Sequence, residues 1–128
     1  MNPQSHIEET LFKLSTSPII KQITNMKKYQ GNSYGYMRMR LTLINGDFLE
    51  IAEYFVLQND RIDICRYRYQ WMDATQQILN KRWDDTKHFP HLQNFPHHVH
   101  VRSETQVVSG QKLSIIELID LLEQELNT

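Results

Sequence analysis

A β-hairpin centred on Asn45-Gly46 is the feature that most constrains the fold, because this dipeptide suits the positive φ angles of tight β-turns. Apolar and polar residues alternate on both sides of the turn, as they do along strands that bury one face. The apolar set comprises Met37, Met39, Leu41 and Leu43 before the turn and Leu49, Ile51 and Phe55 after it, if one residue is bulged at the turn. The sequence therefore predicts an antiparallel sheet with a buried face, in a register that brings Glu50 close to Arg40.

Further alternating runs extend this sheet into a meander. Strands are expected at 19–29, 62–72 and 78–84, and a short strand is expected in the second half of 95–101. The alternation slips near Cys65, which indicates a bulge. Turns are expected at 58–60 and 73–77, and residues 85–94 are expected to form a loop because they include Pro90 and show no periodicity.

Capping-box spacing predicts a helix near each end of the chain. Ser5 and Glu8 have this spacing, and so do Ser114 and Glu117, with apolar residues at helical intervals after each pair. The first helix is expected to begin at Ser5 and to end before Pro18. The predicted fold class is α+β, a single domain spanning 1–128 in which both helices pack on one face of the antiparallel meander.

Composition excludes several classes of protein. The formal net charge of −1 argues against a uniformly basic surface and leaves only a local basic patch for nucleic acid. Cys65 is the only cysteine, which excludes an internal disulfide and favours a reducing compartment. Neither a secretory signal nor a membrane-spanning run is recognisable, so we expect a cytoplasmic protein without membrane contact.

Histidines are the first candidates for chemistry. Five of them lie within thirteen positions, at 88, 91, 97, 98 and 100. His98 and His100 fall on the same face of the expected short strand, where they could act as acid or base near neutral pH. As an alternative they could ligate a divalent metal, together with His88 and Asp84. A structural role, in which the rings hold the loop on the sheet through ordinary hydrogen bonds, is equally open.

Arginine and aromatic residues on the strands are the second set of candidates. Guanidinium groups pair with phosphates, and unstacked RNA bases lie on aromatic rings, so this composition suits RNA binding. The candidate substrate-binding residues are Arg40, Tyr67, Arg68, Tyr69 and Trp71. The same residues would also make the cross-strand contacts that are common in any sheet.

Glu53 is the third candidate, because the hairpin register places this carboxylate among apolar neighbours. It should therefore pair with Arg38 or Arg66, or have a raised pKa that suits a general base. A register shift of one residue would instead place Glu53 in solvent.

Several blocks of the sequence resemble the TumE-type toxin family of bacterial toxin–antitoxin loci. They lie at 40–43, 45–46, 49–51, 53–54 and 67–71, continue through Asp73, Arg82, Asp84, His88 and Pro90, and end in Phe95-Pro96-His97-His98-Val99-His100-Val101. The sequence departs from the family pattern at Trp83, where tyrosine is usual, and at Phe89, where a second histidine commonly follows the first. The resemblance implies a cytoplasmic toxin with a helix-turn-helix antitoxin as partner, and the Phe89 departure implies a weakened or repurposed site.

The leading hypothesis is a toxin that acts as a metal-independent ribonuclease without a cofactor. His98 or His100 would serve as acid or base, Glu53 as its counterpart, and Arg82 would stabilise the charge of the phosphorane. A divalent metal is the alternative cofactor. A second hypothesis is a non-enzymatic protein-interaction module, and an exposed sheet edge would also allow a homodimer.

Overall fold

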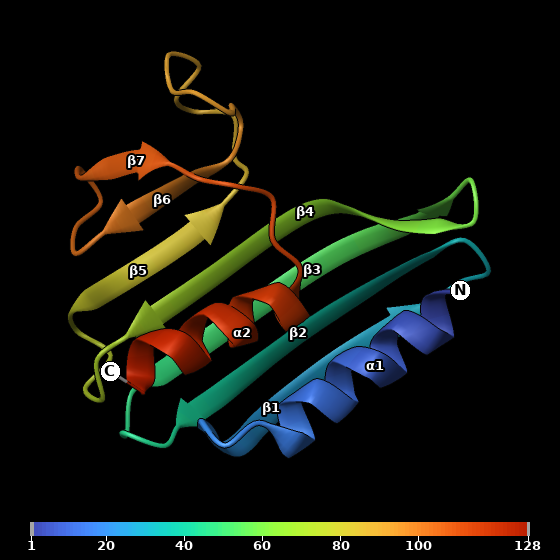
Figure 1. Cartoon of the computed structure of the whole chain (residues 1–128), viewed down its shortest axis with the longest axis horizontal. Helices are drawn as coiled ribbons and strands as arrows, with labels where there is room; N and C mark the ends of the chain where they lie inside the picture. The colour runs from blue at the N-terminus through green and yellow to red at the C-terminus, as the bar shows by residue number, and fades with distance from the viewer. Residues whose placement is uncertain (1, 128) are drawn as a thin grey trace.

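The computed structural model describes residues 2–127, which contain two helices and seven strands. These are α1 (Pro3–Thr16), β1 (Ile20–Gln30), β2 (Tyr34–Leu43), β3 (Phe48–Gln58), β4 (Arg61–Met72), β5 (Leu79–Asp84), β6 (His98–Val101), β7 (Val107–Ser109) and α2 (Ile115–Leu126). The strands form one sheet in chain order, each antiparallel to its neighbours (Figure 1). The predicted α+β class, with an antiparallel meander and two terminal helices, is confirmed.

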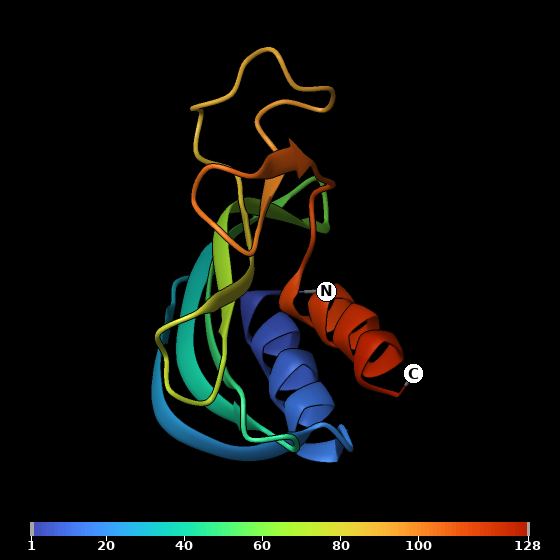
Figure 2. The ribbon, with the colours of Figure 1, turned by 90° about the vertical axis from the view of Figure 1, so that its left-hand side faces the viewer.

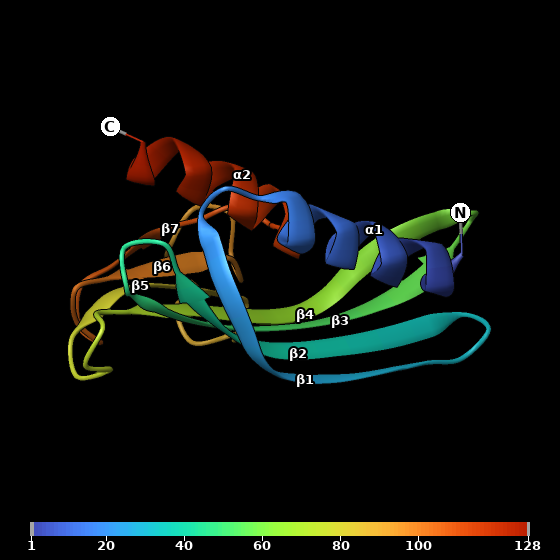
Figure 3. The ribbon, with the colours of Figure 1, turned by 90° about the horizontal axis from the view of Figure 1, so that it is seen from below.

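Both helices cover the same face of the sheet, as Figures 2 and 3 show. We call this the inner face and the opposite one the outer face. The buried core between the inner face and the helices includes Met37, Met39, Leu41, Leu49, Ile51, Phe55 and Tyr69 from the strands, and Ile7, Leu14, Ile115, Leu118, Ile119 and Leu122 from the helices. Each fully buried aliphatic side chain contributes roughly 1.5–3 kcal/mol to folding. The alternation of the strands then directs the intervening polar side chains to the outer face.

The β2–β3 hairpin has the predicted register. Arg40 pairs with Glu50, and the turn between the strands contains Gly46 at a φ of +93°, which glycine adopts without strain. The expected bulge near Cys65 is also present, because the β3–β4 register shifts between the Tyr54 and Phe55 pairs. The bulge keeps the apolar residues of β4 on the inner face on both sides of Cys65.

The helix boundaries agree with the sequence only in part. α1 begins at Pro3 rather than Ser5, because the side chain of Asn2 accepts a hydrogen bond from the Ser5 backbone N–H at 2.8 Å and caps the helix. The capping box of α2 is confirmed, with both reciprocal hydrogen bonds between Ser114 and Glu117. The short strand β7 was not predicted. Within residues 2–127, no helix combines the length and the apolar character that crossing a membrane requires.

Candidate functional site

Four ionisable side chains come together on the outer face where β5 meets β6. Antiparallel pairing places Asp84 opposite His98 and Arg82 opposite His100, so all four side chains share one face. We call Arg82, Asp84, His98 and His100 the histidine cluster. All four are buried, with exposed fractions of 8%, 4%, 2% and 5% in that order. Buried ionisable groups are costly unless they are paired, so their contacts are informative.

Backbone carbonyls fix the orientation of both imidazoles. Nδ1 of His98 lies 2.9 Å from the carbonyl oxygen of Pro96, and Nδ1 of His100 lies 3.1 Å from that of Glu104. A carbonyl oxygen only accepts hydrogen bonds, so each Nδ1 carries a proton and donates it. In the neutral imidazole, the lone pair is therefore on Nε2 of each ring. Burial lowers the pKa of His100, and the nearby Arg82 guanidinium lowers it further.

The two Nε2 atoms face Asp84. Nε2 of His98 lies 2.8 Å from Oδ1 of Asp84, and Nε2 of His100 lies 3.8 Å from Oδ2. Despite the short distance, Nε2 of His98 has no hydrogen-bond partner among residues 2–127. Asp84 accepts instead from the Thr86 backbone N–H at 3.0 Å and from Nε of Arg82 at 3.2 Å. The contact between His98 and Asp84 is thus close but not aligned as a hydrogen bond.

Arg82 is held by side chains of the protein. Its guanidinium donates two hydrogen bonds to the Glu104 carboxylate, one of them at 2.6 Å, and a further one to Gln70 at 3.3 Å. These bonds from Arg82 lower the pKa of Glu104. The Glu104 side chain is 66% exposed, in the turn between β6 and β7. A ligand with two anionic oxygens could replace it on the same guanidinium.

The remaining histidines lie outside the histidine cluster. His88 is exposed, its ring packs against Phe89, and it does not belong to the group that Asp84 forms with His98 and His100. Phe89 lies edge-on against the rings of His98 and His100, with ring centroids 4.8 and 5.8 Å away. The ring of His97 stacks on Tyr67, whose hydroxyl lies 2.8 Å from Nδ1 of His97.

Glu53 lies on the inner face, on the other side of the sheet from the histidine cluster. It is fully buried, as the hairpin register predicted, but the expected pairing with Arg38 or Arg66 is wrong because both arginines lie on the outer face. Its partner is His6 on α1, whose Nε2 lies 2.5 Å from Oε1 of Glu53. Oε2 accepts from the Ile115 backbone N–H at 2.8 Å and from the Tyr69 hydroxyl at 3.4 Å. Glu53 therefore joins the sheet to both helices and is not beside His98 or His100.

The predicted substrate-binding residues divide between the two faces. The rings of Tyr67, Tyr69 and Trp71 are buried on the inner face, with exposed fractions of 4%, 0% and 9%. These rings are therefore core residues and offer no open surface for base stacking. Arg40 and Arg68 lie on the outer face with exposed side chains.

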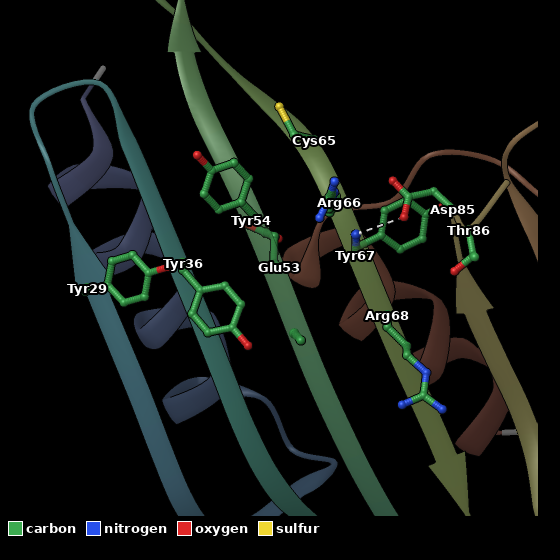
Figure 4. A pocket seen from close by; sticks show the side chains of 11 residues that line it. Tyr29, Tyr36, Glu53, Tyr54, Cys65, Arg66, Tyr67, Arg68, Asp85 and Thr86 are labelled. Carbon is green, nitrogen blue, oxygen red and sulfur yellow. Dashed lines mark hydrogen bonds between the residues drawn. The ribbon is translucent and has the colours of Figure 1, made fainter.

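Three tyrosines that the sequence analysis did not select lie on the outer face instead. Tyr29, Tyr36 and Tyr54 follow one another across β1, β2 and β3, and Tyr54 pairs with Arg66 on β4. They line a hollow of about 640 Å³ together with Arg66 and Arg68 (Figure 4, in which the helices lie behind the sheet). The signal that could have revealed them is the alternation itself, because Tyr36 and Tyr54 occupy the positions between the apolar residues of the hairpin.

Two further rows of outer-face side chains connect this hollow to the histidine cluster. The first row crosses the sheet through Lys27, Arg38, Ala52, Arg68, Asp84 and His98, and the second through Asn25, Arg40, Glu50, Gln70, Arg82 and His100. Neighbouring strands lie about 4.8 Å apart, so Arg68 is roughly 10 Å from the strand of His98. The outer face thus carries a continuous polar surface that ends at the histidine cluster.

A family model described as Toxin TumE matches residues 8–127. The match includes the histidine cluster and the outer-face residues, and it confirms the resemblance seen in the sequence. No curated protein and no solved structure matches the chain.

Proposed function

Because the chain belongs to the TumE toxin family and is the toxin component of a toxin–antitoxin system, we propose that it binds single-stranded RNA on its outer face and cleaves it beside the histidine cluster. The observation that carries the proposal is the arrangement of the outer face, where basic and tyrosine side chains lead across five strands to buried histidines. The toxin family also implies an antitoxin partner.

Charge on the outer face favours an anionic ligand. Exposed basic side chains lie there, among them Lys27, Arg38, Arg40, Arg66 and Arg68, although the whole chain has a formal net charge of −1. Glu50 offsets part of this charge, since it accepts from Arg38 at 3.2 Å and from Arg40 at 3.0 Å. The side chains of Arg38 and Arg40 are still 50% and 52% exposed and can pair with phosphates.

The tyrosines favour single-stranded over double-stranded RNA. Tyr29 and Tyr36 stack with ring centroids 5.4 Å apart, and Tyr29 is half exposed at 50%. A base stacked on such a ring contributes about 1–3 kcal/mol, and only unpaired bases can reach it. The rings and most of the guanidinium groups lie in adjacent rows, so one RNA strand could place bases on the rings and phosphates on the guanidinium groups.

The histidine cluster is the part of this surface that can perform chemistry. Cleavage of RNA by its own 2′-hydroxyl requires removal of the hydroxyl proton, stabilisation of charge on the phosphorus oxygens, and a proton for the leaving 5′-oxygen. The cluster places Asp84, rather than Glu53, as the carboxylate beside the two imidazoles. Arg82 can contact a phosphate if that phosphate displaces the exposed Glu104.

Removing three outer-face arginines should weaken RNA binding through the salt-dependent part of the affinity. For single strands, log K falls with log salt, and each phosphate contact makes this slope steeper by about 0.7. The slope should therefore become shallower by about 2 in the triple variant Arg38→Ala, Arg66→Ala, Arg68→Ala. The measurement is fluorescence anisotropy of a labelled uridine-rich oligonucleotide at several salt concentrations.

The matched control is Lys13→Ala, which removes one positive charge from α1 on the inner side of the sheet, where Lys13 pairs with Asp120 and Glu123 of α2. This variant should leave the slope unchanged. An unchanged slope in the triple variant would refute RNA binding on the outer face. If the triple variant instead loses only antitoxin binding, the outer face is a protein-docking surface.

A further inference from the structure

We propose that Asp84, His98 and His100 form a binding site for one divalent transition-metal ion. Two imidazole nitrogens and one carboxylate oxygen are the donors, and these ligand atoms all lie within 4.8 Å of one another. Imidazole suits zinc, copper, iron and nickel, whereas magnesium and calcium prefer all-oxygen sites. The donor set therefore selects the transition metals, and we take Zn²⁺ as the probe.

Distances within the histidine cluster fit a common ion. Ligand atoms held at about 2.0–2.2 Å from zinc with tetrahedral angles lie about 3.3–3.6 Å apart. The distances from Nε2 of His98 and of His100 to the nearer Asp84 oxygens are 2.8 and 3.8 Å, on either side of that range. The ligand atoms lie within 4.8 Å of one another, so an ion can be accommodated if the side chains draw together by about 1 Å.

The contacts of the Nδ1 atoms are those of metal-ligating histidines. A histidine that binds a metal through one nitrogen almost always donates its other N–H to a carboxylate, a backbone carbonyl or water, which fixes the ring. Both imidazoles meet this condition, because each Nδ1 donates to a backbone carbonyl, that of Pro96 or that of Glu104. The lone pairs on both Nε2 atoms are thereby kept for a common ligand beside Asp84.

Nε2 of His98 gives separate support for a metal site, because it lacks a hydrogen-bond partner among the described residues. Nε2 of His98 is buried and has no hydrogen-bond partner within residues 2–127, although it lies 2.8 Å from an Asp84 oxygen. A lone pair that close to a carboxylate oxygen is repelled unless a proton or a metal ion lies between them, and the two groups are not aligned for the hydrogen bond that a proton would make. Arg82 offers one positive charge against the two negative charges of Asp84 and Glu104, so the local balance favours an added cation.

Three protein ligands would leave one position on the ion open. Zinc sites of this type activate a bound water or polarise a phosphoryl oxygen, whereas structural zinc sites are closed by four protein ligands. This extension rests on the proposed function, because the open position would receive a phosphate from RNA on the outer face. Metal binding itself stands independently of RNA cleavage.

Direct titration with Zn²⁺ tests the site. Tag-free protein is stripped with a chelator, dialysed against Zn²⁺ and analysed for metal content, and its affinity is measured by calorimetry. The wild type should bind one zinc ion per chain. His98→Ala and His100→Ala should each weaken zinc binding at least about 100-fold, because each removes a ligand, and the loss of an outer-shell contact alone already costs about 10–100-fold in affinity. The control variants His88→Ala and His91→Ala remove exposed histidines of the same loop and should bind like the wild type.

Each outcome decides the proposal. Wild-type protein that holds less than one zinc ion per chain at micromolar Zn²⁺, or a folded His98→Ala variant that binds normally, overturns the site. Since the wild type alone can give the first result, the test does not depend on the stability of any variant. The salt slope of RNA binding, measured on zinc-free protein, tests the proposed function separately, so either proposal can fail while the other stands.

Discussion

Replacing Glu53 with alanine should lower the free energy of unfolding by about 3–5 kcal/mol, because three buried polar groups lose their partner and each unsatisfied buried group costs about 1–3 kcal/mol. Glu53 is fully buried and contacts His6, the Ile115 backbone N–H and the Tyr69 hydroxyl. Its loss leaves a buried imidazole and the first N–H of α2 without their acceptor. The measurement is the midpoint of urea unfolding, followed by circular dichroism.

Glu50 provides the matched control, because it lies on the same strand but on the outer face. Its carboxylate pairs with exposed Arg38 and Arg40, so Glu50→Ala should cost less than about 1 kcal/mol. The Glu53→Gln variant, measured where it is folded, should retain RNA cleavage because Glu53 is remote from the histidine cluster. Equal stability losses in the two alanine variants would contradict the buried role of Glu53, and loss of cleavage in folded Glu53→Gln would restore its predicted catalytic role.

Replacing His98 or His100 with alanine should reduce the rate of RNA cleavage by about 10²–10⁴-fold, the range typical for a residue that transfers protons at the reacting atoms. The loss is expected whether the imidazoles act directly or hold a metal, because both need the Nε2 lone pairs beside Asp84. The measurement is the single-turnover rate on a single-stranded RNA, with growth arrest in cells as a second readout.

Folding and RNA binding must be measured on the same variants. The dependence of RNA affinity on salt concentration should be unchanged, because neither histidine is one of the exposed lysine and arginine residues that contact phosphates on the outer face. His88→Ala and His91→Ala should cleave at the wild-type rate, since both side chains are exposed and neither belongs to the group of side chains that converges on Asp84. Folded His98→Ala protein with normal cleavage and toxicity would leave the histidine cluster a structural clasp and favour the interaction-module hypothesis.

The hairpin was predictable because its information is local. The Asn45-Gly46 turn fixes the register of β2 and β3, and strict alternation then assigns each side chain to a face, including the burial of Glu53. The Ser114 and Glu117 capping box is local in the same way. The start of α1 was misplaced because Asn2 provides the cap before Pro3, in competition with the Ser5 and Glu8 spacing.

It was less predictable which carboxylate lies beside His98 and His100, because this depends on contacts between strands that a long loop separates. Whether His98 and His100 share a face with Asp84 or with Glu53 depends on the β5–β6 register, and the segment between these strands has no periodicity to set it. β7 was missed because three residues are too short to show alternation. By contrast, the inner-face position of Tyr67, Tyr69 and Trp71 follows from their alternation along β4 and was available in the sequence.

Photocrosslinking locates bound RNA most directly. A single-stranded RNA containing 4-thiouridine is irradiated with the purified wild-type toxin, and crosslinked peptides are identified by mass spectrometry. We predict crosslinks at Tyr29, Tyr36 or Tyr54, which line the hollow on the outer face (Figure 4). Crosslinks confined to α1 or α2, or none under conditions where the RNA is bound, would contradict RNA recognition on the outer face of the sheet.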